Sequence, residues 1–160
     1  MMIRSRVGQL IVALIAATAC DRTPTDATLR ASLPLAEQAA ADGLSTLRVG
    51  SVRFYGDTAR IEAPTHVEQG ARVDFFVTTY GNGCVGRDTT ITTVQGMRIT
   101  IVPYQRVSRN PRLACLDILL IDRRRVQVVF GTPGSATLRV VGREEPGGRL
   151  FVLERRIVVR

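Results

Sequence analysis

From about residue 47 onward, the chain alternates apolar and polar residues with a period of two. In one run Val73, Phe75 and Val77 are apolar and most of their neighbours are polar, and the stretches around Ile99 and Val128 repeat this pattern. Successive side chains of a β-strand point to opposite faces of a sheet, so this period indicates strands with one buried face. The expected strands cover residues 48–55, 59–63, 73–77, 87–94, 97–101, 114–121, 126–130, 136–143 and 150–159.

Residues that favour turns separate these strands. Glycine accepts a positive φ, and proline fixes φ near the value that many turns need. Such residues occur at 80–83, 95–96, 132–134 and 145–148. No helical pattern of crossover length lies between the strands, so the sequence predicts an all-β fold built as an antiparallel β-sandwich or barrel.

The stretch VEQGARVDFFVTTYGNGC, residues 67–84, places a glycine turn before a core strand. This order resembles the opening of immunoglobulin-like domains in bacterial surface proteins. The resemblance extends as a fold pattern over residues 47–160, and it implies an immunoglobulin-like β-sandwich.

The first 20 residues have the pattern of an export signal. Arg4 and Arg6 precede an uncharged run of 13 residues, 7–19. A membrane-spanning helix needs about 20 apolar residues, so this run is too short to span a bilayer and has the length of a signal-peptide core. The small residues of Ala17-Thr-Ala-Cys20 end the run, and their order resembles the lipobox of bacterial lipoproteins.

That resemblance implies that residues 1–19 are removed and that Cys20 becomes the lipid-modified first residue. The protein would then be anchored to a membrane of the cell envelope, on its extracytoplasmic side. An ordinary secretory signal, with Cys20 incidental, is the alternative. Residues 20–46 are polar and rich in Ala. We therefore expect a flexible tether with room for a short helix at 20–46, followed by one domain at 47–160.

Cys84 and Cys115 remain once Cys20 is assigned to lipid. An even pair of cysteines in an exported chain indicates a disulfide. A metal site would need further ligands, but the chain has one His, and neither cysteine has a partner at C-x-x-C spacing. We therefore expect a structural disulfide between Cys84 and Cys115, with no metal and no cofactor.

All 22 basic residues are Arg, and they are unevenly distributed. Residues 98–160 hold 13 Arg against 5 acids, whereas residues 20–97 hold 7 Arg against 9 acids. Outside the cytoplasm, such a basic half indicates an anionic lipid or glycan as a partner rather than nucleic acid. Alternation sends neighbouring Arg residues to opposite faces of a strand, however, so solvated strand faces explain the same excess. The candidate anion contacts are Arg123, Arg124, Arg125 and Arg156.

No motif of enzyme chemistry accompanies these features. His66 is the single histidine and lacks a nucleophile signature, so we expect it to be a solvated side chain rather than a base. A glycosidase-like site would need two carboxylates within about 5 to 10 Å of each other across a cleft. The acids considered for such a pair are Asp74, Asp88, Asp117 and Asp122.

The glycine-rich stretch YGNGCVG, residues 80–86, could offer backbone N–H groups to an anion. It lacks the Lys of a P-loop, and a hairpin turn held by Cys84 explains the same residues. The sequence therefore favours a lipid-anchored, non-catalytic β-sandwich with a structural role or with an envelope protein, anionic glycan or lipid as its partner. A carboxylate-based extracytoplasmic hydrolase is the alternative.

Overall fold

The computed structural model describes residues 29, 33, 43–54 and 57–160. The expected signal peptide, Cys20 and most of the expected tether lie outside these residues. Over the described part the chain is nearly all β, which confirms the predicted fold class. The strands are β1 (Ser45–Val49), β2 (Ser51–Phe54), β3 (Ile61–Glu62), β4 (His66–Val67), β5 (Arg72–Gly81), β6 (Val85–Gln95), β7 (Arg98–Ser108), β8 (Leu120–Val129), β9 (Gly134–Glu145) and β10 (Arg149–Val159).

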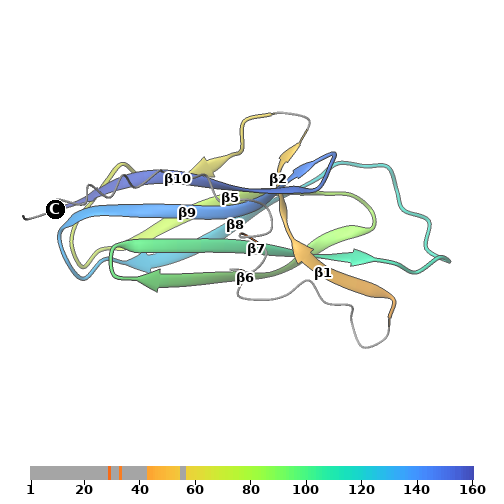
Figure 1. Ribbon diagram of the computed structural model, residues 1–160, viewed down its shortest axis with the longest axis horizontal. Coiled ribbons are helices and arrows are strands. Elements are labelled where there is room, and N and C mark those ends of the chain that lie inside the picture. The colour runs from red at the N-terminus through yellow and green to blue at the C-terminus, as the bar shows by residue number, and fades with distance from the viewer. Residues whose placement is uncertain (1–28, 30–32, 34–42, 55–56) are drawn as a thin grey trace, which may run out of the picture.

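The strands form one sheet that curls back on itself, so that β5 and β8 lie behind β7 and β9 (Figure 1). In front, β10 pairs antiparallel with β9 along its length, and β6 pairs antiparallel with β7. Behind, β5 and β8 pair antiparallel. The short strand β2 joins the two groups, because it pairs with β9 on one side and, through Ser51 opposite Tyr80, with β5 on the other.

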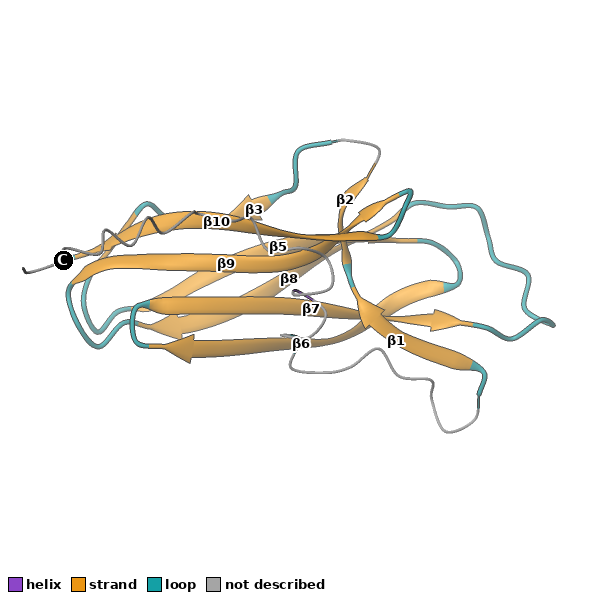
Figure 2. Cartoon of the chain, in the orientation of Figure 1, coloured by secondary structure: helices purple, strands orange, loops and turns teal. Residues whose placement is uncertain are grey.

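The sequence pattern predicted an antiparallel arrangement, and this prediction is wrong in part, because the sheet is mixed. β9 runs parallel to both β7 and β2, and β4 runs parallel to β10. After β7 the chain crosses to the back to form β8 beside β5, and it then returns to the front as β9 in the direction of β7 (Figure 2). Alternation within a strand carries no information about the direction of its neighbour, which is why the sequence missed this.

The main hydrophobic core fills the space inside the curl. Its side chains come from β5 and β8 at the back and from β7, β9 and β10 at the front. The rings of Phe75 and Phe130 meet edge to face there, with centroids 6.4 Å apart. The predicted period of two holds in β8, where Val126 and Val128 are buried and Gln127 between them is exposed. Burial of these apolar faces is the main driving force for the fold.

A second, smaller core covers the other face of β7 and β9. Tyr104 and Val141 are buried in it, together with Leu29, which is 4% exposed. Leu33 packs against the same cluster. Residues 29 and 33 thus contact the domain although they precede its first strand. Because apolar groups cover both faces, β7 buries consecutive residues such as Ile101 and Val102.

One expected strand is wrong over most of its length. Residues 114–121 read as a strand, but only Leu120 and Ile121 belong to one, and the preceding residues form a loop between β7 and β8. All residues from 111 to 120 are exposed. Their apolar side chains have no opposing layer to cover them, so the run that resembled a buried strand lies at the surface.

Candidate functional site

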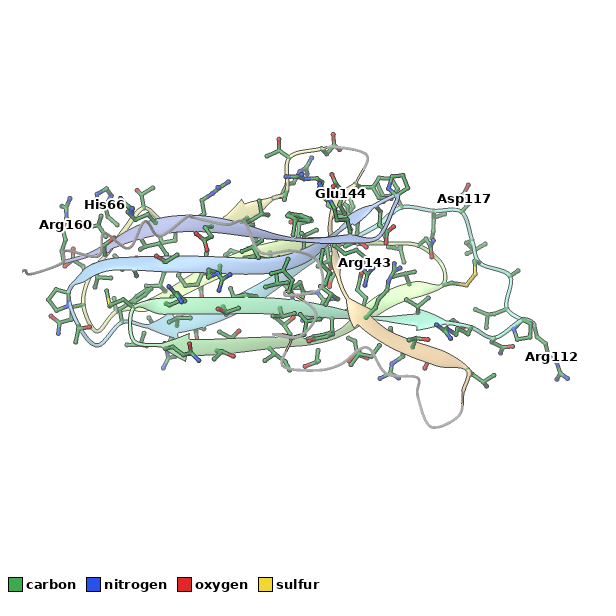
Figure 3. The ribbon with its side chains drawn as sticks, viewed as in Figure 1. His66, Arg112, Asp117, Arg143, Glu144 and Arg160 are labelled. Carbon is green, nitrogen blue, oxygen red and sulfur yellow. A yellow bond between two sulfur atoms is a disulfide. The ribbon has the colours of Figure 1, made fainter. Side chains whose placement is uncertain are left out.

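One end of the molecule combines a hairpin turn, a long loop and a disulfide. The turn joins β5 to β6, and the loop, residues 109–119, joins β7 to β8. Cys84 and Cys115 are bonded, with their Cα atoms 5.1 Å apart, which confirms the predicted disulfide. In Figure 3 the labelled Arg112 marks the tip of this loop, and Asp117 lies between the tip and the body of the domain. We call residues 109–119 the tip loop.

The glycine turn before Cys84 is a structural hairpin whose N–H groups are already used. Gly83 donates its backbone N–H to the carbonyl oxygen of Leu116 at 3.1 Å. The N–H of Cys84 is donated to the side-chain oxygen of Asn82 at 2.9 Å, and that of Val85 to the carbonyl oxygen of Asn82 at 3.0 Å. These N–H groups therefore hold the turn and the tip loop together and are not available to an anion.

Glycine is required in this turn by close approach rather than by a positive φ. A Cβ atom added at Gly83 would lie 2.5 Å from the backbone nitrogen of Leu116. One added at Gly81 would lie 2.2 Å from the carbonyl oxygen of Val85. Real Cβ atoms do not approach backbone this closely, so the turn and the tip loop can meet only where side chains are absent.

The tip loop and the start of β8 expose large apolar side chains in sequence. Six residues between 113 and 121 are each at least 42% exposed, and Leu116 reaches 63%. A cluster of exposed apolar side chains on a protein surface indicates an interaction site, whereas single exposed apolar residues are common. These six residues, called the apolar rim, are Leu113, Leu116, Ile118, Leu119, Leu120 and Ile121.

A cleft of about 620 Å³ lies between the tip loop and the strands β2, β5 and β9. Its apolar lining includes Ile118 and Leu119 of the apolar rim, and Phe54 and Tyr80, whose ring centroids are 6.3 Å apart. The remaining lining residues are Arg48, Ser51, Gly81, Asn82, Val85, Asp117, Glu145 and Pro146. The cleft therefore combines apolar side chains with several charged and polar ones, which can orient a bound group.

The polar floor of the cleft is organised around Glu145. Arg48 lies 3.2 Å from its carboxylate, and the hydroxyl of Ser51 donates to the same oxygen at 3.2 Å. Behind Ser51, the buried side chain of Gln105 accepts the N–H of Ser51 and donates to the carbonyl oxygen of Tyr80, each at 2.9 Å. Gln105 therefore fixes β2, β5 and β7 relative to one another beneath the cleft.

The acids considered for a hydrolase do not meet in this cleft. Only Asp117 lines it, and Asp117 is exposed on the tip loop. Its one carboxylate neighbour in the lining is Glu145, whose charge Arg48 already neutralises. The other three form ion pairs elsewhere: Asp74 with Arg125 at 2.7 Å, Asp88 with Arg106 at 2.8 Å, and Asp122 with Arg87 at 3.5 Å.

The four candidate anion contacts do not form one surface. Arg123 and Arg125 lie on the outer face of β8, paired with Glu62 at 2.6 Å and with Asp74 at 2.7 Å. Arg123 also stacks over the ring of Phe76, 3.5 Å from its centroid. Arg156 is exposed on β10 and forms no ion pair with any residue that the structure describes. Its strand belongs to the front of the curl, away from β8.

Arg124 points into the molecule, as the alternation predicts, and its side chain is 1% exposed. Burial lowers the pKa of its guanidinium, and the charge of Asp122, 3.1 Å away, acts in the opposite direction. The guanidinium donates to the carbonyl oxygen of Thr89 at 2.9 Å and to the hydroxyls of Thr90 and Thr79 at 3.1 and 3.2 Å. Arg124 therefore links β8 to β5 and β6 from inside.

His66 is exposed on β4, where its Nδ1 lies 3.0 Å from the hydroxyl of Thr65. Figure 3 places His66 at the end of the molecule opposite Arg112.

Among the described residues, no group of three or more His, Cys, Asp or Glu side chains could hold a metal ion. Nor does that part of the chain include a helix with the length and hydropathy needed to cross a membrane.

Comparison of the chain with protein-family models, with curated proteins and with solved structures finds no match.

Two buried polar residues with structural roles were not identified from the sequence. Gln105 sits at a buried position of β7, and Arg143 of β9 is 7% exposed, with its guanidinium 2.6 Å from the carbonyl oxygen of Gly148. Each lies where an apolar run gives way to charged residues, so nothing in the local sequence marks it as buried. Their partners come from other strands, so no local pattern identified them.

Proposed function

We propose that this chain is a lipid-anchored protein of the bacterial cell envelope whose all-β domain is non-catalytic and binds another envelope component. Residues 1–20 support the anchor, because a basic start, a short apolar run and small residues before Cys20 are the features of a lipoprotein signal. The Cys84–Cys115 disulfide fits an oxidising compartment outside the cytoplasm.

The observation that carries the binding role is the apolar rim beside the cleft. Leaving six large apolar side chains in water has a cost in solubility, and a disulfide and a backbone hydrogen bond hold the loop that displays them. A loop with a structural role alone would pack these side chains inward. We assign the rim and the adjoining cleft as the binding surface of the domain.

We further propose that the curled sheet is a variant of the immunoglobulin-like β-sandwich. In its favour, two groups of strands enclose the main core, and most neighbours pair antiparallel. It would differ from that sandwich in the parallel pairing of β7 with β9.

A carboxylate hydrolase is the weaker candidate. It is favoured only by the presence of Asp117 and Glu145 in one cleft. Such chemistry needs one carboxylic acid to be protonated and the other ionised. Against it, Asp117 is exposed on the tip loop, and Glu145 is already engaged by Arg48 and Ser51.

The anchor is tested by expressing the native chain and its Cys20→Ala variant in a bacterium that processes lipoproteins. Mass spectrometry of the membrane fraction should show an N-terminal peptide that begins at Cys20 and carries acyl chains. The Cys20→Ala variant should be released from the membrane or remain unprocessed. A soluble, trimmed native protein with an unmodified Cys20 would exclude the anchor.

A further inference from the structure

We infer that the apolar rim docks on the surface of a phospholipid bilayer, with Leu113 and Leu116 entering the boundary between headgroups and acyl chains. This inference deepens the proposed function, on which it rests, by naming the component that the rim binds. Three features of the described residues support it: charge beside the rim, the form of the loop, and the place at which the N-terminal segment meets the domain.

The charges next to the rim match anionic lipid headgroups. Arg109 and Arg112 are exposed in the same loop, and neither forms an ion pair with any other described residue. The loop contains one acid, Asp117. Surface-binding segments combine apolar side chains that enter the acyl boundary with Arg or Lys that remains among the headgroups. In contrast, the Arg residues on the outer face of β8 are paired with Glu62 and Asp74.

The form of the loop also suits a bilayer. The tip loop projects beyond the ends of the strands as a narrow extension (Figure 1). All residues from 111 to 120 are exposed, so the loop presents side chains on every side rather than one flat face. A protein partner gains affinity from a complementary, well-packed surface, whereas a fluid interface accommodates apolar side chains in any arrangement.

The N-terminal segment approaches the domain at positions that keep it close to a membrane. Leu44, itself 46% exposed, accepts the backbone N–H of Arg109 at 2.7 Å, so the first strand begins beside the tip loop. Leu29 is buried against the domain, and it lies nine residue steps along the chain from Cys20. Nine steps reach at most about 30 Å when the chain is fully extended, so a lipidated Cys20 would hold the domain near the bilayer.

A single-tryptophan experiment tests the inference, because the chain contains no Trp. Leu116→Trp places a reporter in the rim at a position that does not line the cleft. Val94→Trp is the matched control: Val94 is 51% exposed on the β6–β7 hairpin at the opposite end. The full chain carrying either change is reconstituted into vesicles of phosphatidylcholine, alone or with phosphatidylglycerol, with and without brominated acyl chains.

We expect the Leu116→Trp emission to shift to the blue and to fall about twofold with brominated lipid, as for a side chain at the acyl boundary. The Val94→Trp emission should not change. Adding Leu113→Asp to Leu116→Trp should abolish the quenching. Arg112→Ser should weaken contact with the vesicles that contain phosphatidylglycerol by about fivefold, the equivalent of about 1 kcal/mol per Arg near an anionic surface.

Unquenched Leu116→Trp emission on both kinds of vesicle would overturn the inference. A blue shift that needs no vesicles and grows with protein concentration would also overturn it, because it would assign the rim to a second copy of the chain. The result is independent of the anchor. Quenched emission from a chain whose Cys20 carries no lipid would support bilayer docking while the proposed anchor failed.

Discussion

The backbone N–H of Gly83 donates to the carbonyl oxygen of Leu116 at 3.1 Å, one residue away from each cysteine of the Cys84–Cys115 disulfide. A covalent bond and a hydrogen bond thus fix the tip loop to the β5–β6 turn at the same place. Because the backbone is fixed at Leu116, the loop keeps its position on the domain while the side chains of the apolar rim stay exposed. This attachment connects the stability of the domain to the binding role proposed for the rim.

Removing the disulfide should destabilise the domain. The Cys84→Ser and Cys115→Ser double variant should lose about 2 to 5 kcal/mol of unfolding free energy, because the 31-residue separation constrains the unfolded chain. Urea unfolding of the native protein with and without reductant gives the same comparison without mutation. Equal midpoints in all of these samples would show that the bond contributes nothing to stability.

Gly83→Ala should be costly although it adds a single methyl group. The new Cβ would meet the backbone of Leu116, so the turn or the loop must move, and we expect a loss of about 1 to 3 kcal/mol. Gly86→Ala is the matched control, since a Cβ there would meet nothing within 4 Å. If the two variants unfold at the same denaturant concentration, the backbone of Leu116 does not approach Gly83 closely enough to exclude a side chain.

Arg124 and Arg125 are adjacent in sequence but should differ sharply when they are changed. Arg124→Met leaves the carbonyl oxygen of Thr89 and the nearby hydroxyls without their buried donor, and we expect it to cost about 2 to 3 kcal/mol. Arg125 is 59% exposed and pairs with Asp74 at the surface, where solvent screens the interaction, so Arg125→Met should cost far less than Arg124→Met. Denaturant unfolding of both variants measures the difference, and similar losses would place Arg124 at the surface.

Stability should fall in acid through the exposed ion pairs. The hydrogen bond from Arg125, and next that from Gln127, lowers the pKa of Asp74; the Arg123 hydrogen bond lowers that of Glu62. A carboxyl whose pKa is lower in the folded than in the unfolded state stabilises the fold fully above its unfolded pKa, about 4, and loses that contribution as pH falls through the folded value.

Unfolding midpoints measured from pH 6 downward should therefore decline below about pH 4. Asp74→Asn should make that decline shallower. Asp57→Asn, at an exposed position without an ion pair among the described residues, should leave it unchanged. If Asp74→Asn does not alter the dependence of the midpoint on pH, Asp74 does not contribute to the loss of stability in acid.

The sequence was sufficient for features that depend on local pattern. A period of two identified β5 and β8 because one face of each strand packs on the core. The pairing of Cys84 with Cys115 followed from their being an even pair in a chain predicted to be exported. Alternation also separated Arg124 from Arg125, which the structure places inside and outside the sheet.

Features that depend on distant partners could not be predicted in this way. An apolar run such as 114–119 is compatible with a buried strand or an exposed loop, and only the absence of a covering layer decides between them. The cleft needs the tip loop, β2 and the end of β9 to meet, which depends on the parallel return of β9. For the same reason Gln105, which bonds to Ser51 and Tyr80, had no recognisable role in the sequence.

Photo-crosslinking in intact cells tests the central claim, that an anchored domain binds an envelope component through its apolar rim. A photoreactive amino acid is placed at Leu116 in one variant and at Val94 in the other, both exposed and at opposite ends of the domain. We predict abundant adducts from position 116 and few from position 94. Adducts that are absent from both positions, or equally abundant at both, would contradict the account.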